Sequence, residues 1–130
     1  MTDDEWRQFF QIAGEVLGPG EWSSAESVSW CAFTTFSSLK MGAEYSNHGI
    51  PAASELGATS TTDGGTWGEP ISYRDLAHVI VPRSFFWETK PSPNYANGTR
   101  HQDIDRLSDA LLAAGIAHRL TDLVLEVKLY

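Results

Sequence analysis

The sequence predicts a single α+β domain spanning residues 1–130, with a mostly antiparallel sheet of four to six strands and two long helices packed on one face. Apolar residues recur at helical spacing near both ends of the chain, at about residues 3–17 and 103–114. Several short runs elsewhere alternate apolar and polar side chains and are separated by turn-forming residues. Helices and strands in this order are typical of the α+β class.

The first helix is expected at residues 3–17. Thr2 and Glu5 have the spacing of a capping box, in which each side chain accepts an amide N–H at the start of a helix. One broad apolar stripe then follows, formed by Trp6, Phe9, Phe10, Ala13, Val16 and Leu17. Gly18-Pro19-Gly20 ends the pattern, because glycine favours helix stops and proline cannot continue a helix. We expect this helix to pack across the sheet.

Residues 21–41 allow two interpretations. The run from Val28 to Phe36 is rich in aromatic and β-branched residues and alternates along its length, which favours a strand. The same region also fits helical spacing, through Trp22, Ala25, Val28, Ala32, Phe36 and Leu39. The strand is the preferred interpretation. Its large apolar groups on both faces predict a central strand that is covered on both sides.

The middle of the chain is expected to contain turns and short strands. Residues 42–68 are rich in glycine and small polar residues, and Asp63-Gly64-Gly65 predicts a hairpin turn. The apolar run from Leu76 to Val81 ends at Pro82 and predicts a buried strand. Residues 85–87 are interpreted as an edge strand.

The last thirty residues predict a helix followed by a β-hairpin. A loop over residues 88–101 leads into the helix at 103–114, and Gly115 follows where a left-handed cap residue is expected. Alternating apolar residues from Leu123 to Tyr130 indicate the final strand, with the hairpin turn near Thr121-Asp122.

The charge is strongly negative and unevenly distributed. The net charge is −8, and residues 1–63 carry nine acidic residues against Arg7 and Lys40. A nucleic-acid backbone would be repelled, so nucleic-acid binding is not expected. No apolar run approaches the length that spans a membrane, and the acidic first residues do not resemble a signal peptide, so a cytoplasmic protein is expected.

No catalytic motif is evident. The single cysteine, Cys31, lies among apolar neighbours and is expected to be buried and inert. His101 and Asp105 have the spacing of two ligands on one helix face, but no third ligand follows at motif spacing, so no metal site and no cofactor are expected. The alternative, an enzyme or small-ligand binder, would use His48, Arg83 and His101 around a pocket formed by loops 42–68 and 88–101.

The preferred functional interpretation is a small acidic protein-binding domain. In outline the chain resembles small bacterial immunity proteins, although it matches no family motif. That resemblance implies a domain that neutralises a toxin or docks onto another protein. An acidic surface steers a basic partner, and binding should then depend on salt. The expected partner-binding residues are Asp3, Asp4, Glu5, Glu21 and Glu26.

Overall fold

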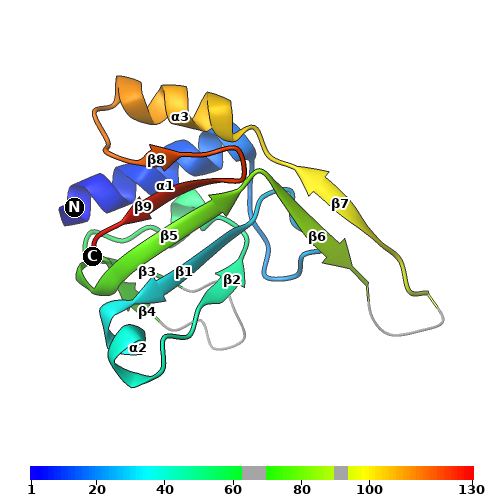
Figure 1. The fold of residues 1–130 in the computed structure, drawn as a ribbon, viewed down its shortest axis with the longest axis horizontal. Helices are drawn as coiled ribbons and strands as arrows, with labels where there is room; N and C mark the ends of the chain where they lie inside the picture. Colours follow the sequence, from blue (N-terminus) through cyan, green and yellow to red (C-terminus); the bar gives the residue numbers. More distant parts are fainter. Residues whose placement is uncertain (63–69, 90–93) are drawn as a thin grey trace.

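The computed structural model of the chain describes residues 1–62, 70–89 and 94–130 (Figure 1). Three α-helices and nine strands alternate irregularly along these residues, with two short 3₁₀ turns, η1 (Ala53–Glu55) and η2 (Tyr73–Asp75). The helices are α1 (Asp3–Leu17), α2 (Phe36–Met41) and α3 (Ile104–Ala113). The strands are β1 (Cys31–Thr35), β2 (Ser46–His48), β3 (Ser60–Thr62), β4 (Pro70–Ser72), β5 (Leu76–Pro82), β6 (Ser84–Glu88), β7 (Asn97–His101), β8 (Arg119–Leu120) and β9 (Val124–Lys128).

The main sheet has five antiparallel strands in the order β2-β1-β5-β9-β8. Two separate two-stranded ribbons, β3/β4 and β6/β7, complete the strand pairing of the described residues. The predicted α+β class and the predicted antiparallel sheet of four to six strands are therefore confirmed. None of the described helices is long and apolar enough to cross a lipid bilayer.

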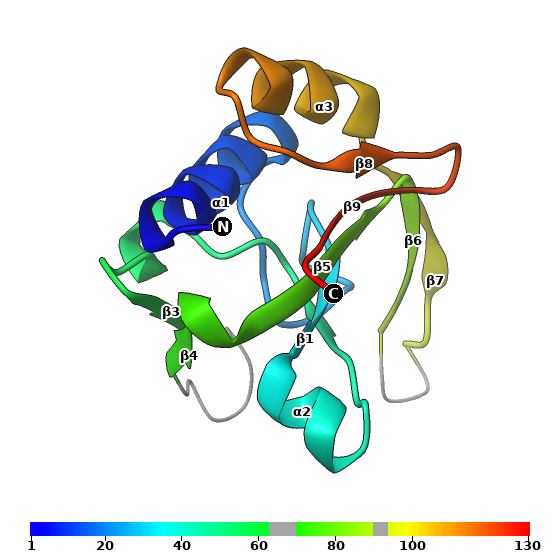
Figure 2. The same cartoon turned by 60° about the vertical axis from the view of Figure 1, so that its left-hand side comes forward.

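The two long helices cover one face of the main sheet. Figure 2 shows α1 and α3 together on one side of β5 and β9, with the β6/β7 ribbon projecting away from both helices. Trp6 and Phe9 of α1 and Leu107 of α3 are fully buried against Val79 and Leu125 of the sheet. Burying each side chain of this size contributes roughly 1.5–3 kcal/mol, so this layer stabilises the fold.

Local chemistry sets the ends of α1 as the sequence predicts. The Thr2 backbone N–H donates to Glu5 Oε1 at 3.0 Å, and the Glu5 backbone N–H donates to Thr2 Oγ1 at 3.1 Å. These two bonds satisfy amides that otherwise lack a helical partner. Gly18 follows with φ of 95°, a conformation that side chains with a Cβ rarely adopt, and the helix ends there.

The predicted strand at Val28–Phe36 is shorter than expected, and a helix follows it directly. Only Cys31–Thr35 forms β1, because Ser27 and Ser29 are held in loop hydrogen bonds instead of a ladder. Thr35 then starts α2, since its hydroxyl accepts the Ser38 backbone N–H at 3.0 Å. Both interpretations of this region were thus partly correct. β1 is central, between β2 and β5, but the two long helices cover only one of its faces.

The C-terminal helix and hairpin follow the prediction closely. α3 ends before Gly115, whose φ of 74° is left-handed, and β8 pairs with β9 across the turn at Thr121-Asp122. Along β9, Leu125 and Val127 are buried, while Leu123 before the strand and Leu129 after it are exposed. The predicted apolar face of this strand is therefore buried only at its centre.

The predicted loop over residues 88–101 is wrong in its second half. Asn97–His101 forms β7, which pairs along its full length with β6, and the predicted strand at 85–87 lies within β6. Asn97-Gly98 has turn-forming composition, but Gly98 is required here because a Cβ would lie 2.8 Å from Trp87 Nε1. The predicted hairpin turn at Asp63-Gly64-Gly65 falls outside the described residues.

Candidate functional site

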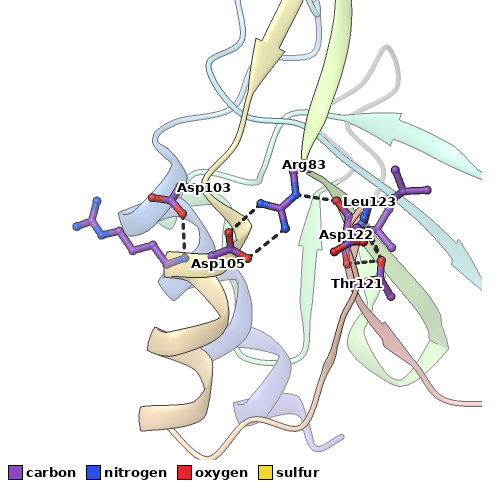
Figure 3. Close-up of polar contacts among 8 residues, drawn as sticks. Arg83, Asp103, Asp105, Thr121, Asp122 and Leu123 are labelled. Atoms are coloured by element: carbon purple, nitrogen blue, oxygen red, sulfur yellow. Dashed lines mark hydrogen bonds and ion pairs between the residues drawn. The ribbon is translucent and has the colours of Figure 1, made fainter.

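Arg83 lies at the centre of a clamp between three elements (Figure 3). Its Nη1 and Nη2 donate to the two carboxylate oxygens of Asp105 at 2.8 and 3.1 Å, and its Nε donates to the Asp122 carbonyl at 2.7 Å. The guanidinium of Arg83 holds the pKa of Asp105 below its usual value, mainly through these hydrogen bonds. Arg83 therefore joins the end of β5 to α3 and to the turn before β9.

The three residues of the predicted enzyme site do not form one constellation. The backbone next to His101 lies beside Arg83, because the Gln102 backbone N–H donates to the Arg83 carbonyl at 2.6 Å. The Asp105 carboxylate, which was expected to be able to bind a metal ion together with His101, instead forms an ion pair with Arg83. His48 is buried on β2, with its ring edge against Phe33 at a centroid distance of 5.3 Å.

The other candidates for nucleophile or metal chemistry are also accounted for. Cys31 is fully buried in the core, and burial raises the pKa of its thiol to about 12. Among the residues that the structure describes, no group of three or more His, Cys, Asp or Glu side chains is arranged to hold a metal ion.

Sequence reasoning missed a polar network on the face of the sheet away from the long helices. Glu126 on β9 is only 14% exposed and lies between two cationic or ionisable groups, His78 Nε2 at 3.5 Å and Arg119 Nη1 at 3.6 Å. His78 Nδ1 lies 2.7 Å from the Tyr45 hydroxyl, which is 3.2 Å from the Tyr130 hydroxyl. The network thus connects the segment before β2 to β5, β9 and the residue at position 130.

His78 is the central residue of this network. Its Nε2 lies 3.5 Å from the Glu126 carboxylate, and its Nδ1 lies 2.7 Å from the Tyr45 hydroxyl. Burial, followed by the contact with Tyr130, raises the pKa of Tyr45 to about 12. Tyr45 therefore remains a hydrogen-bond donor at neutral pH, and the network is suited to fixing the two tyrosines rather than to proton abstraction.

A groove of about 510 Å³ lies beside this network, along the end of β9. Glu126 and Arg119 reach it from one side, and Glu5 of α1 reaches it from another. His118 also lines the groove, and its Nε2 is 2.7 Å from the hydroxyl of the buried Ser108. The charges in the groove are mixed, so its lining selects neither an anion nor a cation.

The predicted partner-binding acids lie at the two ends of α1. Asp3, Asp4 and Glu5 occupy its first turn, whereas Glu21 and Glu26 follow its last turn. At 1.5 Å per residue, the 15-residue helix that lies between the two groups in the sequence is about 20 Å long. The five residues therefore form two acidic sites, and a partner contacting both would have to extend along α1.

Arg100 fixes the second of these acidic sites. Its guanidinium donates to the backbone carbonyls of Ser24, Ala25 and Ser27 at 2.7–3.1 Å and lies 5.0 Å from the centre of the Trp87 ring. A charged donor to several carbonyls is a strong local restraint. We call residues 20–27 the anchored loop. Sequence reasoning missed this contact because the partners are 73–76 residues apart.

Comparison with known proteins yields no match: no family model, no curated protein and no solved structure resembles this chain.

Proposed function

We propose that this protein is a binding domain for a basic protein partner, which it recognises through outward-facing acidic residues. The observation that carries the proposal is the different use of the two kinds of charge. Arg83, Arg100 and Arg119 are bound to groups within the chain, whereas Glu21 and Glu26 are exposed and form no ion pair with another described residue.

This unequal use shapes the electric field around the molecule. A net charge of −8 favours cationic partners, and residues 1–63 carry only two cationic residues, Arg7 and Lys40, against nine acidic residues. Such a field accelerates association and selects partners of opposite sign, and it weakens as salt shortens the Debye length to about 8 Å at physiological ionic strength. A toxin-neutralising or docking role of the immunity-protein type is compatible with this mode of recognition.

The experiment begins with affinity capture from native host cells at low salt, followed by purification of the captured protein. Its dissociation constant is then measured at 50 and 300 mM salt for the unaltered protein and for two charge variants. One variant carries Asp3→Asn with Asp4→Asn, and the other carries Glu21→Gln with Glu26→Gln.

We expect the affinity to fall by at least about tenfold at the higher salt and to fall in at least one variant. An affinity that is unchanged by salt and unchanged in both variants would contradict the proposal. The control is Asp109→Asn, which removes one exposed carboxylate from α3, outside both acidic sites, and should leave binding unaltered.

One observation favours a second function, the binding of a small polar ligand in the groove beside Glu126. The groove combines the partly buried carboxylate of Glu126 with Arg119 and His118, the convergent polar groups expected of a ligand site. Its location differs from the pocket expected between loops 42–68 and 88–101. A metabolite screen by thermal shift tests it: a stabilising compound whose effect disappears in Glu126→Gln would support this function, and a screen without such a compound would not.

A further inference from the structure

A small hollow lies beside the anchored loop. It has a volume of about 180 Å³, and its lining consists of Gly20, Glu21, Trp22, His48, Gly49, Ile50, Pro51 and Glu55. Ligand pockets for drug-sized molecules typically measure 300–1,000 Å³. A hollow of this smaller size matches a single amino-acid side chain.

The lining of the hollow contains two carboxylates and the imidazole of His48. Glu21 and Glu55 contribute carboxylates, and none of the described residues that line it is a lysine or an arginine. The Thr62 hydroxyl donates to Glu55 Oε2 at 3.2 Å, which restricts the position of this carboxylate. A cationic group entering here would therefore meet an acid that is already oriented.

The aromatic wall of the hollow is Trp22, which is 65% exposed. An indole face attracts a cation, and a planar guanidinium both stacks on an aromatic ring and binds a carboxylate through two parallel hydrogen bonds. Exposed tryptophans are also the residues that most often dominate the binding energy of protein interfaces. The combination of Trp22 with two carboxylates fits an arginine better than an apolar side chain.

The walls of the hollow are held before any partner arrives. The Gly49 backbone N–H donates to the Glu21 carbonyl at 2.9 Å, and the Glu21 backbone N–H donates to Ser27 Oγ at 2.9 Å. Gly20 and Gly49 lie so close that a Cβ on either would collide with the backbone of the opposite segment. Preorganisation of this kind reduces the entropy lost on binding.

From these observations we propose that the hollow beside Trp22 receives an arginine side chain of the partner, with the guanidinium between the indole and the carboxylates of Glu21 and Glu55. This inference rests on the proposed function and makes it specific. It assigns the principal contact to the anchored loop rather than to the first turn of α1.

The first test uses Nα-acetyl-arginine methylamide as a probe, titrated into the full-length ¹⁵N-labelled protein. The Trp22 indole N–H signal is identified by its loss in Trp22→Phe. We expect the probe to shift this signal, and we expect Glu21→Gln combined with Glu55→Gln to weaken binding by about tenfold. The citrulline analogue is the uncharged control and should bind at least about tenfold more weakly. No shift, or equal binding of the citrulline analogue, would overturn the inference.

A second test separates this inference from the proposed function. Trp22→Ala is expected to weaken binding of the purified partner about 30-fold, and because Trp22 is largely exposed the variant should remain folded by circular dichroism. If Asp3→Asn with Asp4→Asn weakens binding while Trp22→Ala does not, the hollow is excluded and acidic recognition stands. If neither variant changes a salt-insensitive affinity, both the inference and the proposed function are wrong.

Discussion

Two arginines, Arg83 and Arg100, each hold a different region of this molecule in place. The regions differ in the groups that the arginine binds. Arg83 binds the Asp105 carboxylate and the Asp122 carbonyl, which fastens α3 to the turn before β9. Arg100 instead binds three carbonyls within residues 24–27. The first contact joins elements of the fold to each other, whereas the second immobilises a loop that directs Trp22 toward solvent.

The two regions differ in how their charges are paired. At Arg83 the opposite charges neutralise each other, so little remains to attract a partner. At the anchored loop Arg100 binds backbone carbonyls, and the exposed Glu21 and Glu26 form no ion pair with another described residue. Recognition is expected where the charges are fixed but not neutralised.

The largest expected effect comes from removing β9, which pairs with β5 in the main sheet. Deleting residues 123–130 removes the buried Leu125 and Val127 and the β9 edge of β5, and we expect no cooperative unfolding transition by circular dichroism. The milder Leu125→Ala should lower the free energy of unfolding by about 3 kcal/mol. A truncated protein that unfolds cooperatively would contradict this architecture.

Arg100→Met should lower both the stability of the protein and its affinity for the partner. Loss of the charged hydrogen bonds to carbonyls should lower the free energy of unfolding by about 2 kcal/mol, measured by urea denaturation. The affinity for the partner should also fall, although Arg100 does not line the hollow, because the anchored loop loses its restraint. Arg83→Met is the matched variant: it should reduce stability without changing affinity. Equal affinities for both variants would remove the distinction between the regions.

Tyr45→Phe should have a smaller effect that appears mainly in alkaline solution. The raised pKa of Tyr45, about 12, means that folding favours the protonated phenol. Its contribution to stability is present below the ordinary tyrosine pKa of about 10 and is lost as the pH rises from 10 through 12. Denaturation at pH 9 and 11 should therefore show a steeper loss for the unaltered protein than for Tyr45→Phe. Equal slopes would show that the network does not stabilise the phenol.

Asp105→Asn should produce the smallest change, which is present near neutral pH and disappears in acid. The lowered pKa of Asp105 means that its ion pair with Arg83 stabilises the fold above the ordinary aspartate pKa of about 4 and ceases to do so as the pH falls through the lowered value. The variant should thus be less stable than the unaltered protein at pH 6, and this gap should close by pH 2. A gap that persists at pH 2 would point to packing rather than charge.

The parts of the fold that depend on nearby residues could be predicted from the sequence. The capping box of Thr2 and Glu5 and the glycine stop at Gly18 involve neighbours within a few positions, and α1 formed where they indicate. The apolar run from Leu76 to Val81 is long enough to specify a buried strand by itself, and it became β5.

The parts that depend on distant contacts could not be predicted. Asn97-Gly98 has the composition of a turn, and only the packing of Gly98 against the Trp87 ring explains its place in β7. Five tryptophans look alike in the sequence, but Trp6 is 1% exposed and Trp22 is 65% exposed. Likewise, nothing local indicates that Arg100 binds carbonyls more than 70 residues away.

The most direct test of the account is hydrogen–deuterium exchange of the backbone amides, compared between the free protein and its complex with the purified partner. We predict slower exchange in the complex at residues 20–27 and around Glu55, with unchanged exchange around Arg83 and Asp105. Protection confined to the first turn of α1, or centred on the Glu126 groove, would contradict the claim that the anchored loop is the recognition surface.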